Sequence, residues 1–182
     1  MKPGHLSGGG SFYSSNITDY YLNPYELGYG PFVKFDHDFV GRPAVEKMAG
    51  KPNRKKVTLV WNDKDLAGVF QSLFHAGEDA AKYIDLPIAN YATLPYDKVL
   101  KNGKTVGLST YTGYTYNERA MVSLAMLDID QSAVGTEVTV VWGEEGRGSS
   151  KPTVERHAQT KIRATVAPAP ISDVARSAYR PK

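Results

Sequence analysis

Cysteine is absent from this 182-residue sequence, and so is any long hydrophobic run. Without cysteine the chain has no disulfide, no thiolate metal ligand and no cysteine nucleophile, a composition that suits a reducing compartment. No stretch approaches the roughly 20 apolar residues that cross a bilayer, and the first residues form no apolar signal segment. We therefore expect a soluble, cytoplasmic protein with no membrane partner.

A strong excess of either charge is also lacking. The 22 Lys and Arg residues exceed the 19 Asp and Glu residues by only three, and the longest basic run is Arg54-Lys55-Lys56. Such a short run is more typical of a solvated strand end than of a phosphate-binding track. We expect no nucleic-acid partner. Mild basicity and abundant tyrosine are the only features that favour the alternative, a barrel that binds single-stranded nucleic acid.

Recognisable catalytic and metal-binding motifs are scarce. Asp36-His37-Asp38 resembles a metal cluster, but adjacent side chains diverge along an extended segment, so we expect no metal site. We expect instead a solvated turn that caps the helix after it. Gly103-Lys104-Thr105 lacks the first glycine of a phosphate loop, and no serine lies in a Gly-x-Ser-x-Gly elbow.

Two helices are predicted in the first half of the chain. The first begins at Gly41, has Pro43 in its first turn and ends at Gly50. The second is capped by Asp63 and ends at Gly77. Its apolar residues recur at helical spacing, and they are Leu66, Val69, Phe70, Leu73 and Phe74.

The second half reads as short strands between glycine-containing turns. Asn102-Gly103 predicts a two-residue hairpin turn between Val99-Leu100 and a strand over 105–109. The other expected strands are 57–61, 121–127, 138–142 and 161–166. This succession suggests a small β-barrel or sandwich.

The stretch from Tyr20 to Lys47 is dense in aromatic residues and glycines. Four tyrosines, at 20, 21, 25 and 29, surround Glu26. One interpretation is packing at a domain junction, with each hydroxyl hydrogen-bonded. The other is a pocket for a flat heteroaromatic cofactor, in which rings stack and the carboxylate accepts from ring N–H groups.

The same stretch resembles a known family. Pro24-Tyr25-Glu26, then Lys34, then the run Asp38 to Val45 resemble the folate-dependent aminomethyltransferases, typified by the T-protein of the glycine cleavage system. The run Leu27-Gly28-Tyr29-Gly30 is similar to the sequences of the bacterial branch that demethylates vanillate, syringate and 3-O-methylgallate. Further matches to this branch lie at 56–59, 97–99, 107, 124–125, 135–138 and 151–155.

This resemblance implies an α+β, mainly β fold: a C-terminal Greek-key antiparallel β-barrel of the T-protein type, preceded by a short α/β remnant. Residues 1–19 are then a flexible glycine-rich segment and residues 20–53 the remnant of a preceding folate-binding domain. Residues 54–170 form the barrel, and residues 171–182 a tail. Family members are much longer, so the chain resembles their C-terminal portion only.

The implied reaction moves a methyl group from an aromatic methoxy group to N5 of tetrahydrofolate. The leaving phenolate needs a proton, and either Tyr20 or Tyr21 could donate it. The resemblance assigns cofactor contacts to Phe12, Tyr13, Tyr25 and Glu26. For Phe12 and Tyr13 an alternative stays open, because the glycine-rich run Ser7 to Ser11 also reads as a flexible linker.

The family's catalytic region has no counterpart here, so whether this chain alone is an enzyme stays uncertain. We expect it to be inactive or incomplete without the N-terminal half. The expected partners are a small-molecule methyl donor and either a separate N-terminal polypeptide or further copies of the chain. The alternative function is a non-catalytic barrel module that binds folate or a partner.

Overall fold

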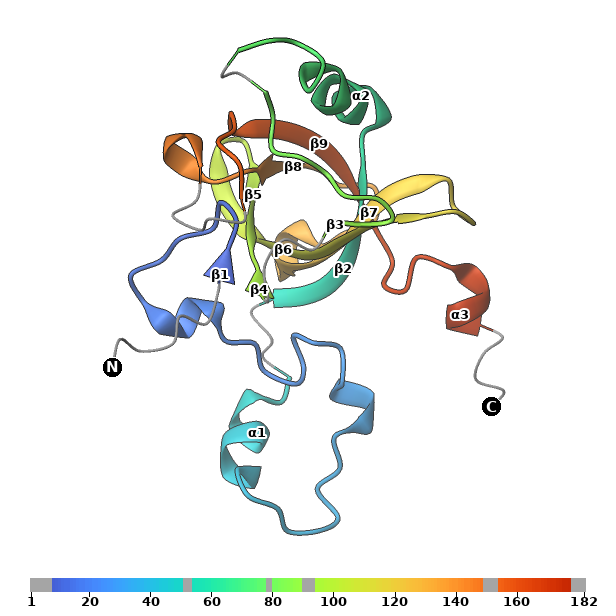
Figure 1. The fold of residues 1–182 in the computed structure, drawn as a ribbon. Coiled ribbons are helices and arrows are strands. Elements are labelled where there is room, and N and C mark those ends of the chain that lie inside the picture. The colour runs from blue at the N-terminus through green and yellow to red at the C-terminus, as the bar shows by residue number, and fades with distance from the viewer. Residues whose placement is uncertain (1–7, 51–53, 78–79, 90–93, 149–153, 178–182) are drawn as a thin grey trace.

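The dominant feature of the fold is a closed ring of antiparallel strands (Figure 1). The computed structural model describes residues 8–50, 54–77, 80–89, 94–148 and 154–177. The ring consists of β2 (Arg54–Trp61), β5 (Asp97–Lys101), β6 (Lys104–Thr115), β7 (Ala120–Asp128), β8 (Glu137–Trp142) and β9 (Thr160–Ala167). Around the ring the order is β2-β7-β6-β5-β8-β9, and β9 pairs with β2 to close it.

The connections make this ring a Greek key. Strands β5, β6 and β7 follow one another as neighbours, and β8 then returns to lie beside β5. All pairings in the ring are antiparallel. The predicted fold class, a mainly β chain with a Greek-key barrel, is therefore confirmed.

The barrel is filled by apolar side chains. Trp61 and Trp142 meet edge to face inside it, with ring centroids 5.5 Å apart. In β9 the buried residues alternate with exposed ones, as the sequence predicted for a half-buried strand. These buried positions are Ile162, Ala164 and Val166.

Shorter elements surround the barrel. Strand β1 (Gly8–Gly9) pairs in parallel with β4 (Leu94–Pro95), and β3 (Ile88–Ala89) pairs with the far end of β6. Helix α2 (Asp63–Ser72) lies against β9. Helix α1 (Arg42–Met48) lies in a lobe that extends away from the barrel (Figure 1). The remaining elements are α3 (Asp173–Ser177) and the 3-10 helices η1 (Ile17–Tyr20), η2 (Gly30–Phe32), η3 (Ile129–Gln131) and η4 (Glu145–Arg147).

Two predicted helix ends are wrong. Asn62 caps α2 in place of Asp63, because its side chain accepts a hydrogen bond from the Asp65 amide. The helix ends at Ser72 and not at Gly77, and Phe74, expected on its apolar face, is 86% exposed.

The acidic turn before α1 also differs from its expected role. Asp36, His37 and Asp38 are exposed, as expected, but Gly41 is the N-terminal cap and receives no side-chain hydrogen bond. The Asp38 carboxylate instead accepts from Arg42 at 3.1 Å. Within the described ranges, no group of three or more histidines, aspartates or glutamates could hold a metal ion.

The ring strands run from Arg54 to Ala167. Residues 1–7, 51–53, 78–79, 90–93, 149–153 and 178–182 of the predicted segments lie outside the described residues, and the division of the chain into four units stays a prediction. None of the described helices combines the length and the apolar character that a membrane-spanning helix needs.

Candidate functional site

The candidate site lies where residues 12–29 pass over the outer face of the barrel. Helix η1 begins after Asn16, whose side chain accepts from the Thr18 amide. This turn directs the Tyr20 ring between two others. Phe12 lies 5.2 Å from it and Tyr96 lies 5.6 Å from it, both edge to face. Segments far apart in sequence thus meet in one aromatic cluster, Phe12–Tyr20–Tyr96.

The hydroxyl of Tyr20, a predicted proton donor, accepts a hydrogen bond from the Ser14 amide at 2.8 Å. Its own hydrogen stays available to donate, because a phenol both accepts and donates. Burial, the main cause, and the nearby hydroxyls of Tyr111 and Tyr20 raise the pKa of Tyr96. The raised pKa favours the neutral phenol of Tyr96, the form that can donate a hydrogen bond.

Glu26 is almost fully buried, with 4% of its surface exposed. One carboxylate oxygen accepts from the Arg54 guanidinium at 3.2 Å, and the other accepts from the Asn23 amide at 3.1 Å. Arg54 also donates to the Tyr21 carbonyl at 2.8 Å. The Glu26 carboxylate thus ties the loop to the start of β2, a structural role that the sequence prediction did not include.

The three other predicted residues lie apart from the cluster. Tyr13 is 82% and Tyr21 64% exposed. Tyr25 is half-buried and directed at the α1 lobe, where its hydroxyl donates to the Val45 carbonyl at 3.4 Å. The structure therefore brings Phe12 and Tyr20 together, places Glu26 beneath the loop, and leaves Tyr13 and Tyr21 facing solvent.

A small cavity of about 250 Å³ lies between this loop and the barrel. Its barrel side comes from the outer face of β2, β6 and β7, and Lys56 lies 5.5 Å from the centre of the Tyr29 ring at its edge. The lining residues are Leu22, Leu27, Tyr29, Lys56, Pro95, Tyr96, Thr110, Tyr111, Leu124 and Met126. Typical small-molecule sites begin near 300 Å³, so this cavity suits one flat ring system and not a whole folate.

A larger cavity, of about 850 Å³, lies at another part of the barrel, beside α2. Its walls include Trp61, Phe70 and Met121, and Arg163 lies at the same cavity, paired with Asp65 at 2.7 Å. None of the six predicted site residues lines either cavity, but the loop cavity shares Tyr96 with the aromatic cluster that contains Phe12 and Tyr20. Size alone therefore does not identify the candidate site.

Sequence reasoning missed several residues of the loop cavity, above all Tyr96 and Lys56. They follow no local pattern, because their place depends on strand pairing across more than 60 positions. Two signals were available: the match at 56–59 includes Lys56, and the match at Asp97-Lys98-Val99 comes immediately after Tyr96.

Comparison with known proteins identifies relatives of this chain. No family model matches the chain. A syringate O-demethylase of Sphingobium sp. (strain NBRC 103272 / SYK-6) is 50% identical over 171 residues, which is 94% of this chain and 37% of that protein. A sesamin methylene transferase of Sinomonas sp. (strain No.22) is 35% identical over 164 residues, which is 85% of this chain and 34% of that protein.

Among solved structures, the glycine cleavage system aminomethyltransferase T of Bartonella henselae is similar over 74% of this chain and 27% of its own. The sequence identity is 18% and the TM-score 0.44. The two curated relatives confirm the predicted resemblance: the chain is homologous to part of syringate O-demethylase and sesamin methylene transferase. It spans little more than a third of the length of either.

Proposed function

We propose that this chain is the C-terminal part of a tetrahydrofolate-dependent methyltransferase that removes methyl groups from methoxy aromatics. The observation that carries the proposal is its 50% identity to syringate O-demethylase over 94% of the chain. By their names, the two relatives act on a methyl group held by oxygen and on a methylene group, which are both one-carbon units. A cytoplasmic location and a small aromatic methyl donor follow from the same proposal.

The residues present fit part of the proposed cofactor. The loop cavity has mostly apolar walls with tyrosines among them, and it has room for one ring system. In this proposal Tyr96 borders the bound ring, Tyr20 and Phe12 extend the aromatic cluster behind it, and Glu26 orders the loop from below. Tyr13 and Tyr25 face other directions, so their contacts with folate require the remaining part of the protein.

When bound, tetrahydrofolate supplies N5 as the acceptor of the methyl group. Loss of the methyl group would leave the substrate as a phenolate that needs a proton, and the proton released by the acceptor nitrogen would afterwards restore the donor. Tyr20 is better placed than Tyr21 to give this proton. Its hydroxyl is oriented by the Ser14 amide and lies in the half-buried cluster, whereas Tyr21 is largely exposed. Holding both reactants together supplies much of the remaining rate gain.

We propose that the chain alone is incomplete for two reasons. Its loop cavity is too small for a whole folate, and helices η2 and α1 contain no buried residue. The test is turnover of syringate with tetrahydrofolate by three samples: the chain, the unmatched part of syringate O-demethylase, and both together. We expect activity only in the mixture. Turnover by the chain alone would contradict the proposal of incompleteness.

Calorimetry separates this function from a non-catalytic module. We expect the mixture to bind tetrahydrofolate, and we expect Tyr20→Phe to lower kcat about tenfold or more while it leaves KM almost unchanged. Binding that is retained with no turnover under any condition would favour the non-catalytic alternative. No binding at all would reject the folate assignment.

A further inference from the structure

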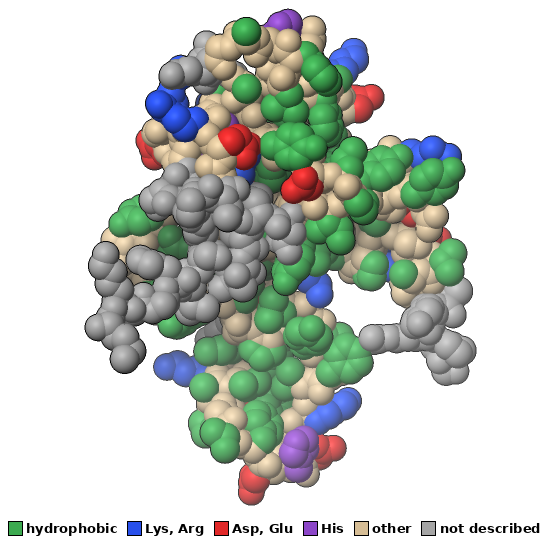
Figure 2. Space-filling view, viewed as in Figure 1, with side chains coloured by type: hydrophobic (Ala, Val, Ile, Leu, Met, Phe, Trp, Pro, Cys, Tyr) green, Lys and Arg blue, Asp and Glu red, His purple; other side chains and the backbone are tan. Residues whose placement is uncertain are grey.

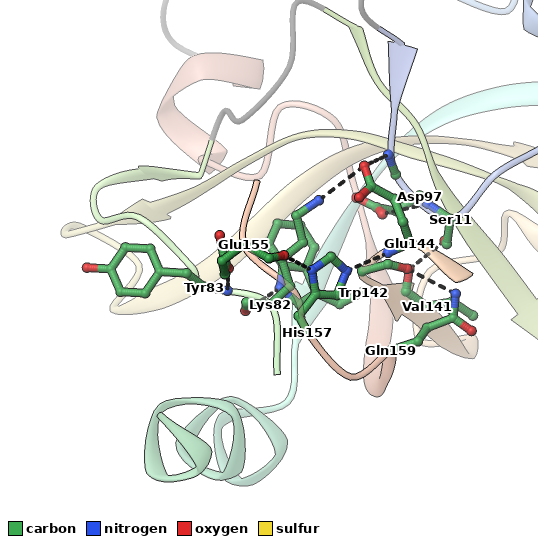
Figure 3. A network of polar contacts seen from close by, with 12 residues as sticks. Ser11, Lys82, Tyr83, Asp97, Val141, Trp142, Glu144, Glu155, His157 and Gln159 are labelled. Carbon is green, nitrogen blue, oxygen red and sulfur yellow. Dashed lines mark hydrogen bonds and ion pairs between the residues drawn. The ribbon is translucent and has the colours of Figure 1, made fainter. Parts of the chain in front are cut away.

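A buried charged cluster lies beneath the N-terminal segment (Figure 3). Its cation is Lys82, which is 1% exposed although it lies in an irregular segment after α2. Its carboxylates are Glu144, which follows β8, and Asp97 at the start of β5. Burial of a lysine this complete is unusual and requires compensating contacts.

Lys82 is fixed at both ends. Its ammonium lies 3.7 Å from the Glu144 carboxylate and 5.4 Å from the centre of the Trp142 ring. Its carbonyl accepts from the Trp142 indole N–H at 2.9 Å. Burial, the largest effect, lowers the pKa of Lys82 to about 8, and Glu144, Asp97 and Glu155 oppose this shift.

His157 holds Glu144 from behind. The imidazole Nε2 accepts from the Glu144 amide at 2.9 Å, and Nδ1 donates to the Glu155 carbonyl at 2.9 Å. This pair of contacts defines a neutral ring with its proton on Nδ1. The histidine is fully buried. The Glu144 carboxylate is therefore presented from a fixed backbone.

The carboxylates of the cluster also bind the N-terminal segment. Glu144 accepts from the Gly10 amide and Asp97 accepts from the Ser11 amide, each at 3.2 Å. The Ser11 hydroxyl donates to the Val141 carbonyl at 2.6 Å and accepts from the Lys98 amide at 2.8 Å. Two consecutive residues are thus held by charged and polar partners from two barrel strands and the turn after β8.

The backbone at position 10 lies so close to the Tyr96 backbone that glycine is required there. Gly10 has a φ of +103°, and a Cβ there would lie 2.2 Å from the Tyr96 carbonyl oxygen. Two backbone hydrogen bonds close the same contact: Tyr96 donates to the Gly9 carbonyl at 2.8 Å, and Phe12 donates to the Tyr96 carbonyl at 3.0 Å. The glycines of this run permit docking and not only flexibility.

We infer that Lys82, Asp97 and Glu144 are positioning residues, which hold Gly10 and Ser11 on the barrel and so set where Phe12 meets Tyr20. The segment between Ser11 and Tyr20 is short, and Phe12 follows the held residues directly. The consequence for ligand binding rests on the proposed function; the effect on the segment does not.

The first test removes the acceptor of the Gly10 amide in the 182-residue chain. We expect Glu144→Ala to speed amide hydrogen exchange at Gly10 and Ser11 at least tenfold and to weaken the nuclear Overhauser contacts between the Phe12 and Tyr20 rings. Glu144→Gln keeps an oxygen acceptor and should give an intermediate effect. Glu145→Ala, at the exposed neighbouring glutamate, should change neither measurement.

A second variant leaves all charged groups in place. We expect Gly10→Ala to release the segment through its clash with Tyr96. Gly135→Ala, at a glycine of φ +87° with open space around it, suffers only the backbone strain and should leave Gly10 exchange unchanged. Slow exchange at Val140 in every variant will show that the barrel is intact.

Ligand binding separates this inference from the proposed function. If the wild-type protein, supplied with the unmatched part of syringate O-demethylase, binds tetrahydrofolate, Glu144→Ala and Phe12→Ala should weaken binding in a non-additive way. If the wild-type protein does not bind it, the proposed function fails while the exchange data still decide the positioning role. Unchanged exchange at Gly10 and Ser11 in both Glu144→Ala and Gly10→Ala would overturn the inference.

Discussion

At the scale of single residues, buried charge decides much of this molecule's behaviour. The Lys82 and Glu26 side chains are buried and Arg54, the partner of Glu26, is partly buried. Each of these two charged contacts ties an irregular segment to the barrel. Desolvating a charge is costly, so such groups persist where their contacts give a specific arrangement. Both contacts help to fix the path that the N-terminal third of the chain takes over the barrel.

Lys82 should make stability depend on pH above neutrality. Its pKa is about 8 in the folded state and near 10.5 when unfolded. Below pH 8 both states carry the proton, and the folded state bears the full cost of burying it. Between pH 8 and 10.5 the unfolded state binds more protons, so the free energy of unfolding rises by at most about 1.4 kcal/mol per pH unit.

We expect Lys82→Met to remove this contribution. The measurement is urea unfolding of both proteins at pH 7 and pH 9.5. Between these two pH values the free energy of unfolding should rise more for the wild type than for Lys82→Met. Lys104→Met, at an exposed lysine of the β5–β6 hairpin, is the control and should keep the wild-type pH dependence. If the free energy of unfolding changed equally with pH in the wild type and in Lys82→Met, Lys82 would not be the source of the pH dependence.

Loss of the Glu26 carboxylate should loosen the aromatic loop. Glu26→Ala leaves Arg54 with backbone carbonyl partners only, and we expect about 2 kcal/mol of local stability to be lost. This corresponds to roughly 30-fold faster amide exchange at Leu27 and Gly28. Glu46→Ala removes an exposed pair with Arg42 and should have almost no effect on these amides. Equal effects of the two variants would contradict a structural role for Glu26.

At the scale of elements, the sequence predicted what local rules control. The Asn102-Gly103 turn is confirmed, with φ of 49° and 78° that suit a two-residue hairpin. The alternation in β9 is also confirmed. The end of α2 was predicted wrongly because Phe74 extends the apolar spacing, yet it lies past the last helical turn and is exposed.

The candidate site was harder to predict than the fold. Tyr20 could be nominated from its aromatic surroundings, but its partner Tyr96 lies 76 positions later and meets it only through the docking of β1 on β4. Lys82 gave no signal, because an isolated lysine in an irregular segment is normally solvated. Long-range pairing is the physical information that local patterns lack.

The β6–β7 pairing should be sensitive to one glycine. A Cβ at Gly107 would lie 2.2 Å from the Met126 carbonyl oxygen, between the paired strands β6 and β7 of the barrel. We expect Gly107→Ala to lower the free energy of unfolding by about 3 kcal/mol, measured in urea. Gly103→Ala, at the hairpin turn with open space around it, should cost about 1 kcal/mol. A Gly107→Ala effect no larger than the Gly103→Ala effect would show that the two strands can move apart.

At the scale of the whole molecule, the barrel and the α1 lobe differ in character. The barrel has a continuous apolar core, whereas η2 and α1 contain no buried residue. Val40 is fully exposed and Met48 is 40% exposed. Figure 2 shows hydrophobic side chains spread over this lobe. A segment that buries so little of its own apolar surface gains little stability to offset the entropy of ordering it.

We therefore expect the lobe to gain protection when the rest of a full-length relative is supplied. The partner to use is the part of syringate O-demethylase that this chain does not match, because the two proteins are 50% identical where they overlap. Hydrogen exchange over residues 30–48 should slow at least tenfold in the mixture, since apolar contacts would replace solvent there. Exchange at the hairpin turn Asn102-Gly103, on the barrel, serves as the control and should stay unchanged. Equal slowing at both places would indicate non-specific association, and no slowing at the lobe would mean that this surface does not face the missing part.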